Sequence, residues 1–299
     1  MKLKITYCFI LLAILALSPA TVYRASGQAT VVDSATRINA GTKEEPKLYH
    51  VNNLVSGIFC VVATAADIYA IPKIIKAKKN FTDKELDGLD PTIFNDVDRW
   101  ALRQDLSKRD MNYKASDYLL PALIVTPSLL MADKKIKKDW VNLLIMYYEV
   151  HAVTFSIYNF SFFGPAFQNK ARPVAYYTEL GYDGRRGGNN RNSMYSGHTA
   201  TAIASTFYMA KIYCDYHPEI GRKKYLLYGL ATVPAIVEGY LRVKALAHFP
   251  SDGMIGLVVG AACGIAVPAL HRYRTHSNLS LGLTATPAGP GFCLEWHPK

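Results

Sequence analysis

Six long apolar segments, separated by charged stretches or stretches with Pro and Gly, dominate the chain. Each is long enough for several helical turns, and none shows the strict alternation of apolar and polar residues that is typical of a strand. The pattern therefore predicts an all-α fold with a six-helix core bundle. The predicted helices cover approximately Leu54–Ile71, Tyr118–Met131, Trp140–Phe160, Gly197–Tyr213, Tyr225–Val243 and Gly253–Leu270.

These segments differ in how readily they would cross a membrane. Gly253–Leu270 has no charged residue over 18 positions, whereas other segments contain Asp67, Glu149 or Lys211. Charged side chains are costly in lipid and easier to accommodate inside a bundle. We expect Glu149 and His151 to be hydrogen-bonded in the interior. With a mean hydropathy of +0.06, the chain is interpreted as a membrane-associated bundle, and a soluble exported bundle remains the alternative.

The N-terminus resembles an export signal. Two lysines within Met1–Lys4 precede the apolar run Ile5–Leu17, and the small residues Ala25–Gly27 offer a cleavage site. We divide the chain into a signal peptide or anchor, a lead-in linker, a main domain and a C-terminal tail that is irregular or forms a hairpin. The corresponding boundaries are 1–27, 28–50, 51–272 and 273–299.

Basic residues in the loops predict a topology. Lys134–Lys138, Arg222–Lys224 and His271–Arg274 fall on one face of a six-helix traverse, and such loops stay on the cytoplasmic side. The opposite face would carry the loops 76–117, 161–196 and 244–252. Export or anchoring of the N-terminal run would reverse this topology. Three alternatives would resolve this conflict between the N-terminal run and the loop charges: the run neither exports nor spans, the first apolar segment does not span, or the bundle is soluble.

Composition excludes several classes of protein. Half of the residues are hydrophobic and 19% are charged, which rules out intrinsic disorder. The 34 Lys and Arg exceed the 23 Asp and Glu by 11, but this surplus is compatible with a solvated basic surface, and we expect no nucleic-acid partner. None of the five cysteines forms a Cys-x-x-Cys pair, so the sequence indicates no zinc site.

Three polar clusters carry the candidate chemistry: Asn169–Pro173, Tyr195–Thr199 and Arg242–Asp252. Together they contain two histidines, two or three cations, one carboxylate and a Ser-Gly turn at the start of a predicted helix. Free N–H groups at a helix N-terminus and planar guanidinium groups suit a phosphoryl group. A histidine near a carboxylate suits a nucleophile, and a second histidine could protonate the leaving oxygen. The clusters therefore predict a phosphate-handling site.

The ordered set Arg172-Pro173, Ser196-Gly197-His198 and Arg242-x5-His248-x3-Asp252 resembles the type 2 phosphatidic acid phosphatase superfamily. This superfamily also includes bacterial class A acid phosphatases and vanadium haloperoxidases. The resemblance covers about residues 50–272, and its third motif is the most specific. It implies a helical bundle with a metal-independent phosphatase site that needs no cofactor.

The resemblance also implies roles for individual residues. His248 would be the nucleophile that forms a phosphohistidine, Asp252 its orienting partner, and His198 the general acid for the leaving group. The groups that would hold the phosphoryl oxygens are Arg172, Arg242, Ser196, the amide of Gly197 and Lys170.

Three positions depart from the family pattern. Pro165 stands where the first motif has a lysine, Tyr195 replaces the usual proline, and Leu241 replaces a serine. We expect activity to survive the changes at Tyr195 and Leu241. The charge of the missing lysine could come from a cation of the following loop: Lys170, Arg185, Arg186 or Arg191.

From these features we expect a phosphatase that hydrolyses phosphate monoesters or pyrophosphates through a phosphohistidine. Lipid phosphates at the periplasmic face of a bacterial-type inner membrane are the favoured substrates. The alternatives are an exported soluble acid phosphatase of broad specificity, a vanadium haloperoxidase that would need bound vanadate, and a catalytically silent lipid-binding membrane protein.

Overall fold

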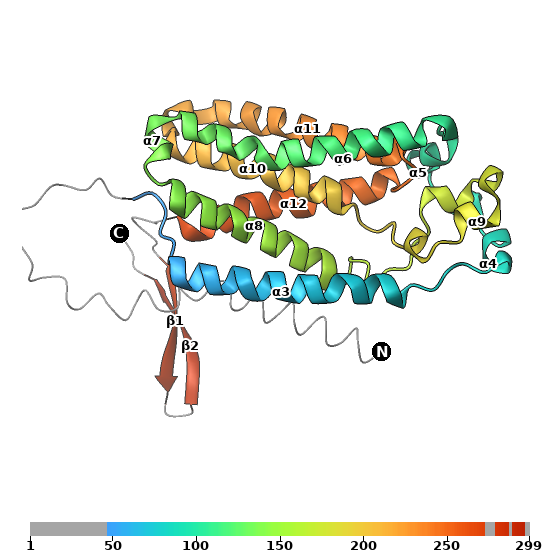
Figure 1. Ribbon diagram of the computed structural model, residues 1–299. Coiled ribbons are helices and arrows are strands. Elements are labelled where there is room, and N and C mark those ends of the chain that lie inside the picture. The colour runs from blue at the N-terminus through green and yellow to red at the C-terminus, as the bar shows by residue number, and fades with distance from the viewer. Residues whose placement is uncertain (1–46, 273–278, 287–288, 297–299) are drawn as a thin grey trace, which may run out of the picture.

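The computed structural model describes residues 47–272, 279–286 and 289–296 (Figure 1). The expected signal or anchor and most of the lead-in linker lie outside these residues. The α-helices are α3 Asn53–Ala77, α4 Asp83–Asp87, α5 Asp96–Arg99, α6 Arg109–Val125, α7 Lys134–Lys137, α8 Trp140–Phe160, α9 Gly181–Arg185, α10 Gly197–Tyr216, α11 Lys224–Lys244 and α12 Pro250–His271. Short 3₁₀ helices cover Pro91–Ile93, Trp100–Arg103, Leu106–Lys108, Thr126–Ala132, Pro173–Tyr176, Thr178–Leu180, Gly188–Arg191 and Pro218–Lys223.

The structure confirms the all-α bundle and its six long helices. Helix α8 has the predicted bounds, whereas α6 begins at Arg109 rather than at Tyr118. The first turns of α6 are mostly polar, so apolar periodicity could not reveal them. After Val125 the same rod continues as the 3₁₀ helix Thr126–Ala132.

The C-terminal tail contains a β-hairpin, which was one of its two predicted forms. Strand β1, Leu279–Thr286, pairs antiparallel with β2, Gly289–Trp296. The pairing runs in continuous register from Leu279 opposite Trp296 to Thr286 opposite Gly289.

Helix α10 is the centre of the bundle. It packs against α6, α8, α11 and α12, and α3 packs on the outer side of α8. The contact between α10 and α12 is close because α12 presents Gly256, Gly260 and Gly264 to the backbone of α10. Side chains at these positions would hold the two helices apart.

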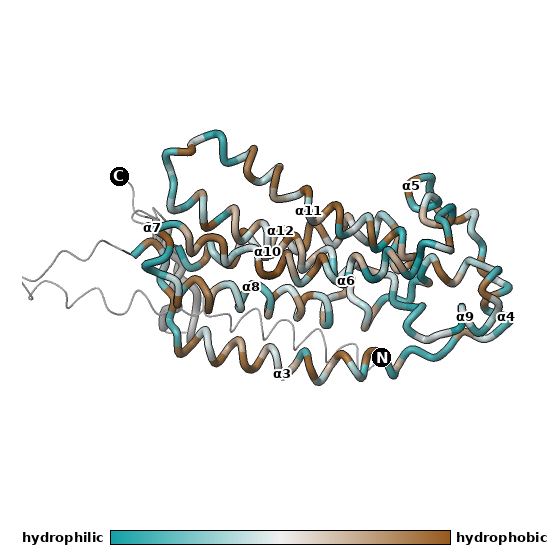
Figure 2. Tube along the Cα trace, turned by 45° about the horizontal axis from the view of Figure 1, so that its top comes forward, coloured by the Kyte–Doolittle hydropathy of each residue, from teal (hydrophilic) through white to brown (hydrophobic). Residues whose placement is uncertain are grey.

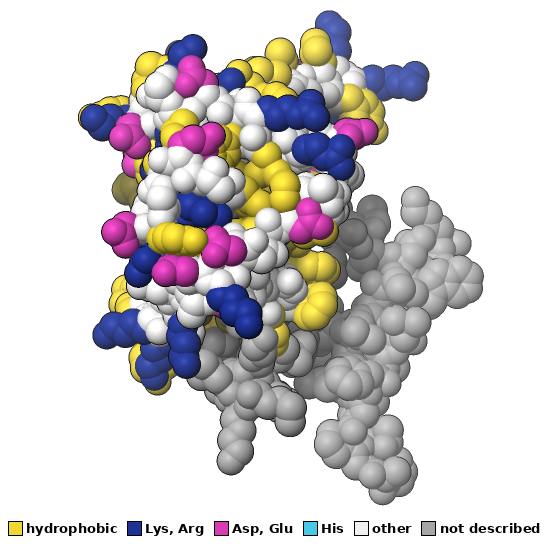
Figure 3. All heavy atoms as spheres, turned by 90° about the vertical axis from the view of Figure 1, so that its right-hand side faces the viewer, with side chains coloured by type: hydrophobic (Ala, Val, Ile, Leu, Met, Phe, Trp, Pro, Cys, Tyr) yellow, Lys and Arg dark blue, Asp and Glu magenta, His cyan; other side chains and the backbone are white. Residues whose placement is uncertain are grey.

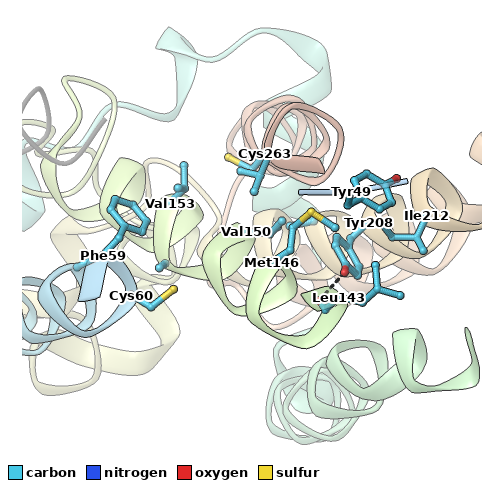
Figure 4. Close-up of a cluster of buried hydrophobic side chains, with 14 of the residues drawn as sticks. Tyr49, Phe59, Cys60, Leu143, Met146, Val150, Val153, Tyr208, Ile212 and Cys263 are labelled. Carbon is cyan, nitrogen blue, oxygen red and sulfur yellow. Dashed lines mark hydrogen bonds between the residues drawn. The ribbon is translucent and has the colours of Figure 1, made fainter. Parts of the chain in front are cut away.

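Between α3, α8, α10 and α12 lies the largest hydrophobic cluster (Figure 4). Phe59 and Cys60 enter it from α3, and Met146 enters it from α8. The hydroxyl of Tyr208, on α10, donates to the carbonyl oxygen of Leu143 at 2.6 Å, so this buried aromatic residue leaves no unpaired polar group. Each such side chain contributes about 1.5–3 kcal/mol through burial.

The outer surface of the bundle is also apolar. Val61 on α3, Leu230 on α11 and Val258 on α12 are 69%, 59% and 70% exposed, and brown segments recur along these helices in Figure 2. Among the described residues, four helices are long and apolar enough to cross a membrane: Asn53–Ala77, Leu106–Ala132, Pro218–Lys244 and Pro250–His271. An apolar surface of this extent supports a membrane protein rather than a soluble exported bundle.

The two ends of the bundle differ in composition. Helices α4, α5 and α9 with their connections form one end, which we call the cap end; α7 lies at the other, which we call the basic end (Figure 1). The described parts of the three predicted basic stretches, Lys134–Lys138, Arg222–Lys224 and His271–Arg272, all lie at the basic end.

The basic end also ties the entry of the chain to its exit. Tyr49 bridges to Arg272 through the backbone, and both side chains bind Asp215 of α10, at 2.6 and 2.8 Å. Nearby, the carboxylate of Glu149 lies 2.9 Å from Nε2 of His271. Farther along α8, His151 Nε2 lies 3.3 Å from the hydroxyl of Ser205. Glu149 and His151 are therefore hydrogen-bonded interior residues, as expected.

Candidate active site

The three polar clusters meet at the cap end because of how α10, α11 and α12 are connected. Helix α10 begins there, with Ser196 as its N-cap. Helix α11 ends there, and a short link leads to α12, whose first residue is Pro250. Proline is favoured at this position because its fixed φ suits the first helical turn. Close packing of α10 on α12 then places His198 beside the loop of His248.

His248 is held as a neutral imidazole. Its side chain is buried, and Nδ1 lies 2.6 Å from the carbonyl oxygen of Ser193. A carbonyl can only accept, so Nδ1 carries the hydrogen and Nε2 keeps a free lone pair. Burial, followed by the charges of Arg172 and Arg242, holds the pKa of His248 well below its usual value. The residue is therefore unprotonated near neutral pH, as a nucleophile must be.

Asp252 does not contact His248 directly, contrary to the expectation that it orients this histidine. Its carboxylate accepts from the backbone N–H of Phe249 at 2.9 Å and from the hydroxyl of Ser193 at 2.6 Å. Because Asp252 lies in the first turn of α12, its side chain turns back to cap that helix. Ser193 links the two groups, since its hydroxyl binds Asp252 while its carbonyl binds His248.

Lys170 is paired with carboxylates rather than left free for a phosphate. Its ammonium lies 2.8 Å from Asp252 and 3.6 Å from Asp98. Asp98, on α5, also accepts from the backbone N–H and the hydroxyl of Ser251 at 2.9 and 2.6 Å. This buried network joins the loop after α8 and the cap to the first turn of α12.

The three arginines considered as substitutes for the missing lysine are engaged in the cap. Arg185 is buried and donates to the carbonyl oxygen of Ala175 at 2.7 Å. Arg186 pairs with Asp83 at 3.1 Å, and Arg191 pairs with Glu85 at 2.8 Å. They stabilise the loops around the site instead of adding a free cation to it.

Of the cations that the sequence assigned to the site, Arg172 and Arg242 remain for a phosphoryl group, although Arg242 also lies 3.4 Å from the carboxylate of Asp117. Arg242 is buried, with its guanidinium 4.4 Å from the centre of the Tyr113 ring. Arg172 donates through Nε to the carbonyl oxygen of Asn192 at 3.2 Å, which fixes the side chain. The charges of both guanidinium groups act on His248 and help to lower its pKa.

The N-terminus of α10 offers backbone donors. The hydroxyl of Ser196, expected to hold a phosphoryl oxygen, caps the helix by accepting from the N–H and hydroxyl of Thr199 at 3.3 and 2.8 Å, and neither bond uses its own hydrogen. Within the part of the chain that the structure describes, no acceptor is bonded to the N–H groups of Gly197 and His198. A Cβ on Gly197 would lie 3.2 Å from the ring of Tyr158, which explains the need for a small residue.

His198 lies at the open side of the site. Its side chain is 34% exposed, and Nε2 lies 3.6 Å from the carboxylate of Asp117 on α6. Partial burial and the charges of Arg242 and Arg172 lower the pKa of His198 to about 3. A bound phosphate dianion would offset the two arginines and so favour the protonated form that a general acid requires.

The sequence model of one protein family, the PAP2 superfamily, matches residues 143–276. Over these residues the chain is similar to the PAP2 superfamily. The match contains all three polar clusters, and it supports a hydrolase of phosphatase type, acting on phosphate esters. No curated protein and no solved structure matches the chain.

The PAP2 region does not include every residue near the site. Tyr113, Ser116 and Asp117 of α6 lie beside Arg242, and they precede residue 143. Sequence reasoning missed them, although their i, i+3, i+4 spacing places them on one helix face. It also missed Ser193, which no sequence signal distinguishes from other loop serines.

Proposed function

We propose that the protein is a phosphatase that hydrolyses phosphate monoesters or pyrophosphates through a phosphohistidine at His248, with lipid phosphates as substrates. The observation that carries the proposal is the state of His248. Its Nδ1–H donates to a carbonyl, its Nε2 is free, and two arginines lie nearby. A neutral nucleophile beside two fixed cations suits attack on an anionic phosphoryl group.

The reaction follows from this arrangement. The guanidinium groups of Arg172 and Arg242, with the N–H groups of Gly197 and His198, bind the phosphoryl oxygens. Nε2 of His248 attacks phosphorus while the bond to the leaving oxygen breaks, and His198 donates a proton to that oxygen. A water molecule then attacks the phosphohistidine, His198 accepts its proton, and inorganic phosphate leaves. Asp252 acts through Ser193 to hold His248 in place.

A lipid substrate is supported by the surface around the cap end. Trp100 of the cap stacks near Tyr240 of α11, with ring centres 5.7 Å apart, and the ammonium of Lys244 lies within 6 Å of both rings. Aromatic and lysine side chains are enriched where a helix passes the lipid headgroups. Figure 3 shows that hydrophobic side chains lie among Lys, Arg, Asp and Glu side chains on the surface of the cap end.

The proposed orientation places the site outside the cytoplasm. At the basic end, lysines and arginines are concentrated in the short stretches Lys134–Lys138 and Arg222–Lys224, whereas at the other end, which holds the site, they are spread over the longer connections 78–108 and 161–196. The positive-inside rule therefore favours a cytoplasmic basic end and, in a bacterial-type inner membrane, a periplasmic site.

Phosphate release by the purified full chain tests the proposal. The substrates are phosphatidate, phosphatidylglycerol phosphate, undecaprenyl pyrophosphate, lipid A and p-nitrophenyl phosphate, and the variant is His248→Ala. His217→Ala is the matched control, because His217 lies at the basic end between Asp133 and Glu219. We expect the wild type and the control to release phosphate and to form an acid-labile phosphoenzyme, and His248→Ala to do neither.

Labelling that persists in His248→Ala would overturn the assignment of the nucleophile. Turnover that requires vanadate, peroxide and halide would indicate a haloperoxidase instead. Absence of turnover on all substrates by well-folded wild-type protein would favour a silent lipid-binding protein.

A further inference from the structure

The first turns of α6 form a wall of the site that the PAP2 match does not cover. The ring of Tyr113 lies 4.4 Å from the Arg242 guanidinium, and the hydroxyl of Ser116 lies 3.4 Å from Nη1 of the same residue. Ser116 also donates to the buried carboxylate of Glu238. Tyr113 and Ser116 therefore hold the Arg242 guanidinium in position from the α6 side.

Asp117 occupies a different place in this wall. Its carboxylate lies 3.4 Å from Nη1 of Arg242 and 3.6 Å from Nε2 of His198, and its side chain is 51% exposed. Within the described part of the chain, no carboxylate other than that of Asp117 lies within 4.0 Å of a ring nitrogen of His198. Asp117 thus stands beside the group that protonates the leaving oxygen, on the open side of the site.

Among the described residues, the cations that the sequence assigned to the site are already engaged with other groups, so none of them is left over for a second phosphate. Arg172 and Arg242 supply two positive charges for a transferred phosphoryl group, and the charge of Arg242 is already partly balanced by the Asp117 carboxylate, 3.4 Å from its Nη1. Lys170 is paired with Asp252 and Asp98. The three arginines considered as substitutes for the missing lysine are tied to carbonyl or carboxylate oxygens: Arg185, Arg186 and Arg191.

We propose that Asp117 is a specificity-determining residue that makes the site select phosphate monoesters over pyrophosphates. This inference rests on the proposed function. The leaving group of a monoester departs as a neutral alcohol once His198 has donated its proton. The leaving group of a lipid pyrophosphate is itself a phosphate anion, which would enter the site beside the Asp117 carboxylate and be repelled by it.

The size of the effect follows from the exposure of Asp117. Two like charges about 6 Å apart in a partly solvated site repel each other enough to change a rate about tenfold. Because half of the side chain is in contact with solvent, salt should screen this repulsion. The preference for monoesters is therefore expected to weaken as ionic strength rises.

The experiment compares dodecyl phosphate with dodecyl diphosphate in the same detergent micelles, using the full chain. We expect the wild type to favour the monophosphate in kcat/KM by about tenfold. Asp117→Asn should remove most of this preference, chiefly by raising turnover of the diphosphate. Asp117→Glu keeps the charge and should keep the preference. Asp110→Asn removes a carboxylate from the same helix two turns away and should leave the ratio unchanged.

The ratio separates specificity from folding, because a misfolded fraction lowers both rates equally. An equal change in both rates in Asp117→Asn would overturn the proposal and show a structural role. A wild-type preference for the diphosphate, or a ratio insensitive to salt, would also overturn it. Failure of the proposed function is distinguishable, since His248→Ala would then retain the activity of the wild type or neither lipid would be hydrolysed.

Discussion

Replacing Gly260 with alanine should separate α10, which carries His198, from α12, which begins two residues after His248. A Cβ at this position would lie 2.0 Å from the carbonyl oxygen of Ala200 and 2.5 Å from Cγ2 of Ile203. The side chain of Ile203 can rotate away, but a backbone oxygen inside α10 cannot. Since ordinary contact begins at 3.4 Å, α10 and α12 must move apart by about 1.4 Å.

The Gly260→Ala substitution should lower both stability and activity. Overpacking of this kind destabilises a protein by about 1–3 kcal/mol. In addition, His198 lies in the first turn of α10 and Asp252 in the first turn of α12, so the displacement reaches the site. A misplacement of about 1 Å at reacting groups can lower a rate by about 100-fold. We therefore expect Gly260→Ala to lower both the unfolding temperature and kcat.

The matched control is Gly57→Ala on α3, where an added Cβ has no heavy atom within 4 Å. Alanine at an open helical position should stabilise the protein by about 0.5–1 kcal/mol. Thermal unfolding in detergent and phosphate release from dodecyl phosphate measure the two effects. If Gly260→Ala matched Gly57→Ala in both assays, the close α10–α12 contact would not be what holds the site together.

Two further predictions concern Lys170 and the orientation. Lys170→Met leaves the buried carboxylates of Asp252 and Asp98 without a counter-charge. Steady-state kinetics should therefore show kcat reduced by at least about tenfold with little change in KM. A raised KM at unchanged kcat would instead indicate that Lys170 binds the substrate. In a variant without the five native cysteines, Arg186→Cys should react with an impermeant maleimide in intact cells and Lys135→Cys should not, and the reverse labelling would refute the proposed orientation.

How far the helices could be predicted depended on their surroundings. The bounds of α8 agreed with the sequence, because apolar residues fill that segment from Trp140 to Phe160. The start of α6 was missed because its first turns face the polar site rather than the core. Hydrophobic periodicity reports burial in an apolar environment, so it fails where a helix lines a reaction centre.

For the site, the sequence indicated the residues but not their connections. The resemblance to the superfamily implied that Asp252 orients His248, yet the local geometry of a helix start turns the carboxylate back onto Phe249 and Ser193. Lys170 was expected near a phosphate, and the structure pairs it with two carboxylates. Such pairings join segments that are distant in sequence, and no local pattern encodes them.

The sequence by itself therefore determined the helical class, the three polar clusters and the resemblance to the superfamily, because periodicity and motif spacing are local properties of the chain. Only the tertiary structure decided which cations remain free, how His248 is held, and that Asp117 of α6 faces His198. These depend on how close α6, α10 and α12 approach one another. That approach is set by small residues such as Gly260, at which a side chain would not fit.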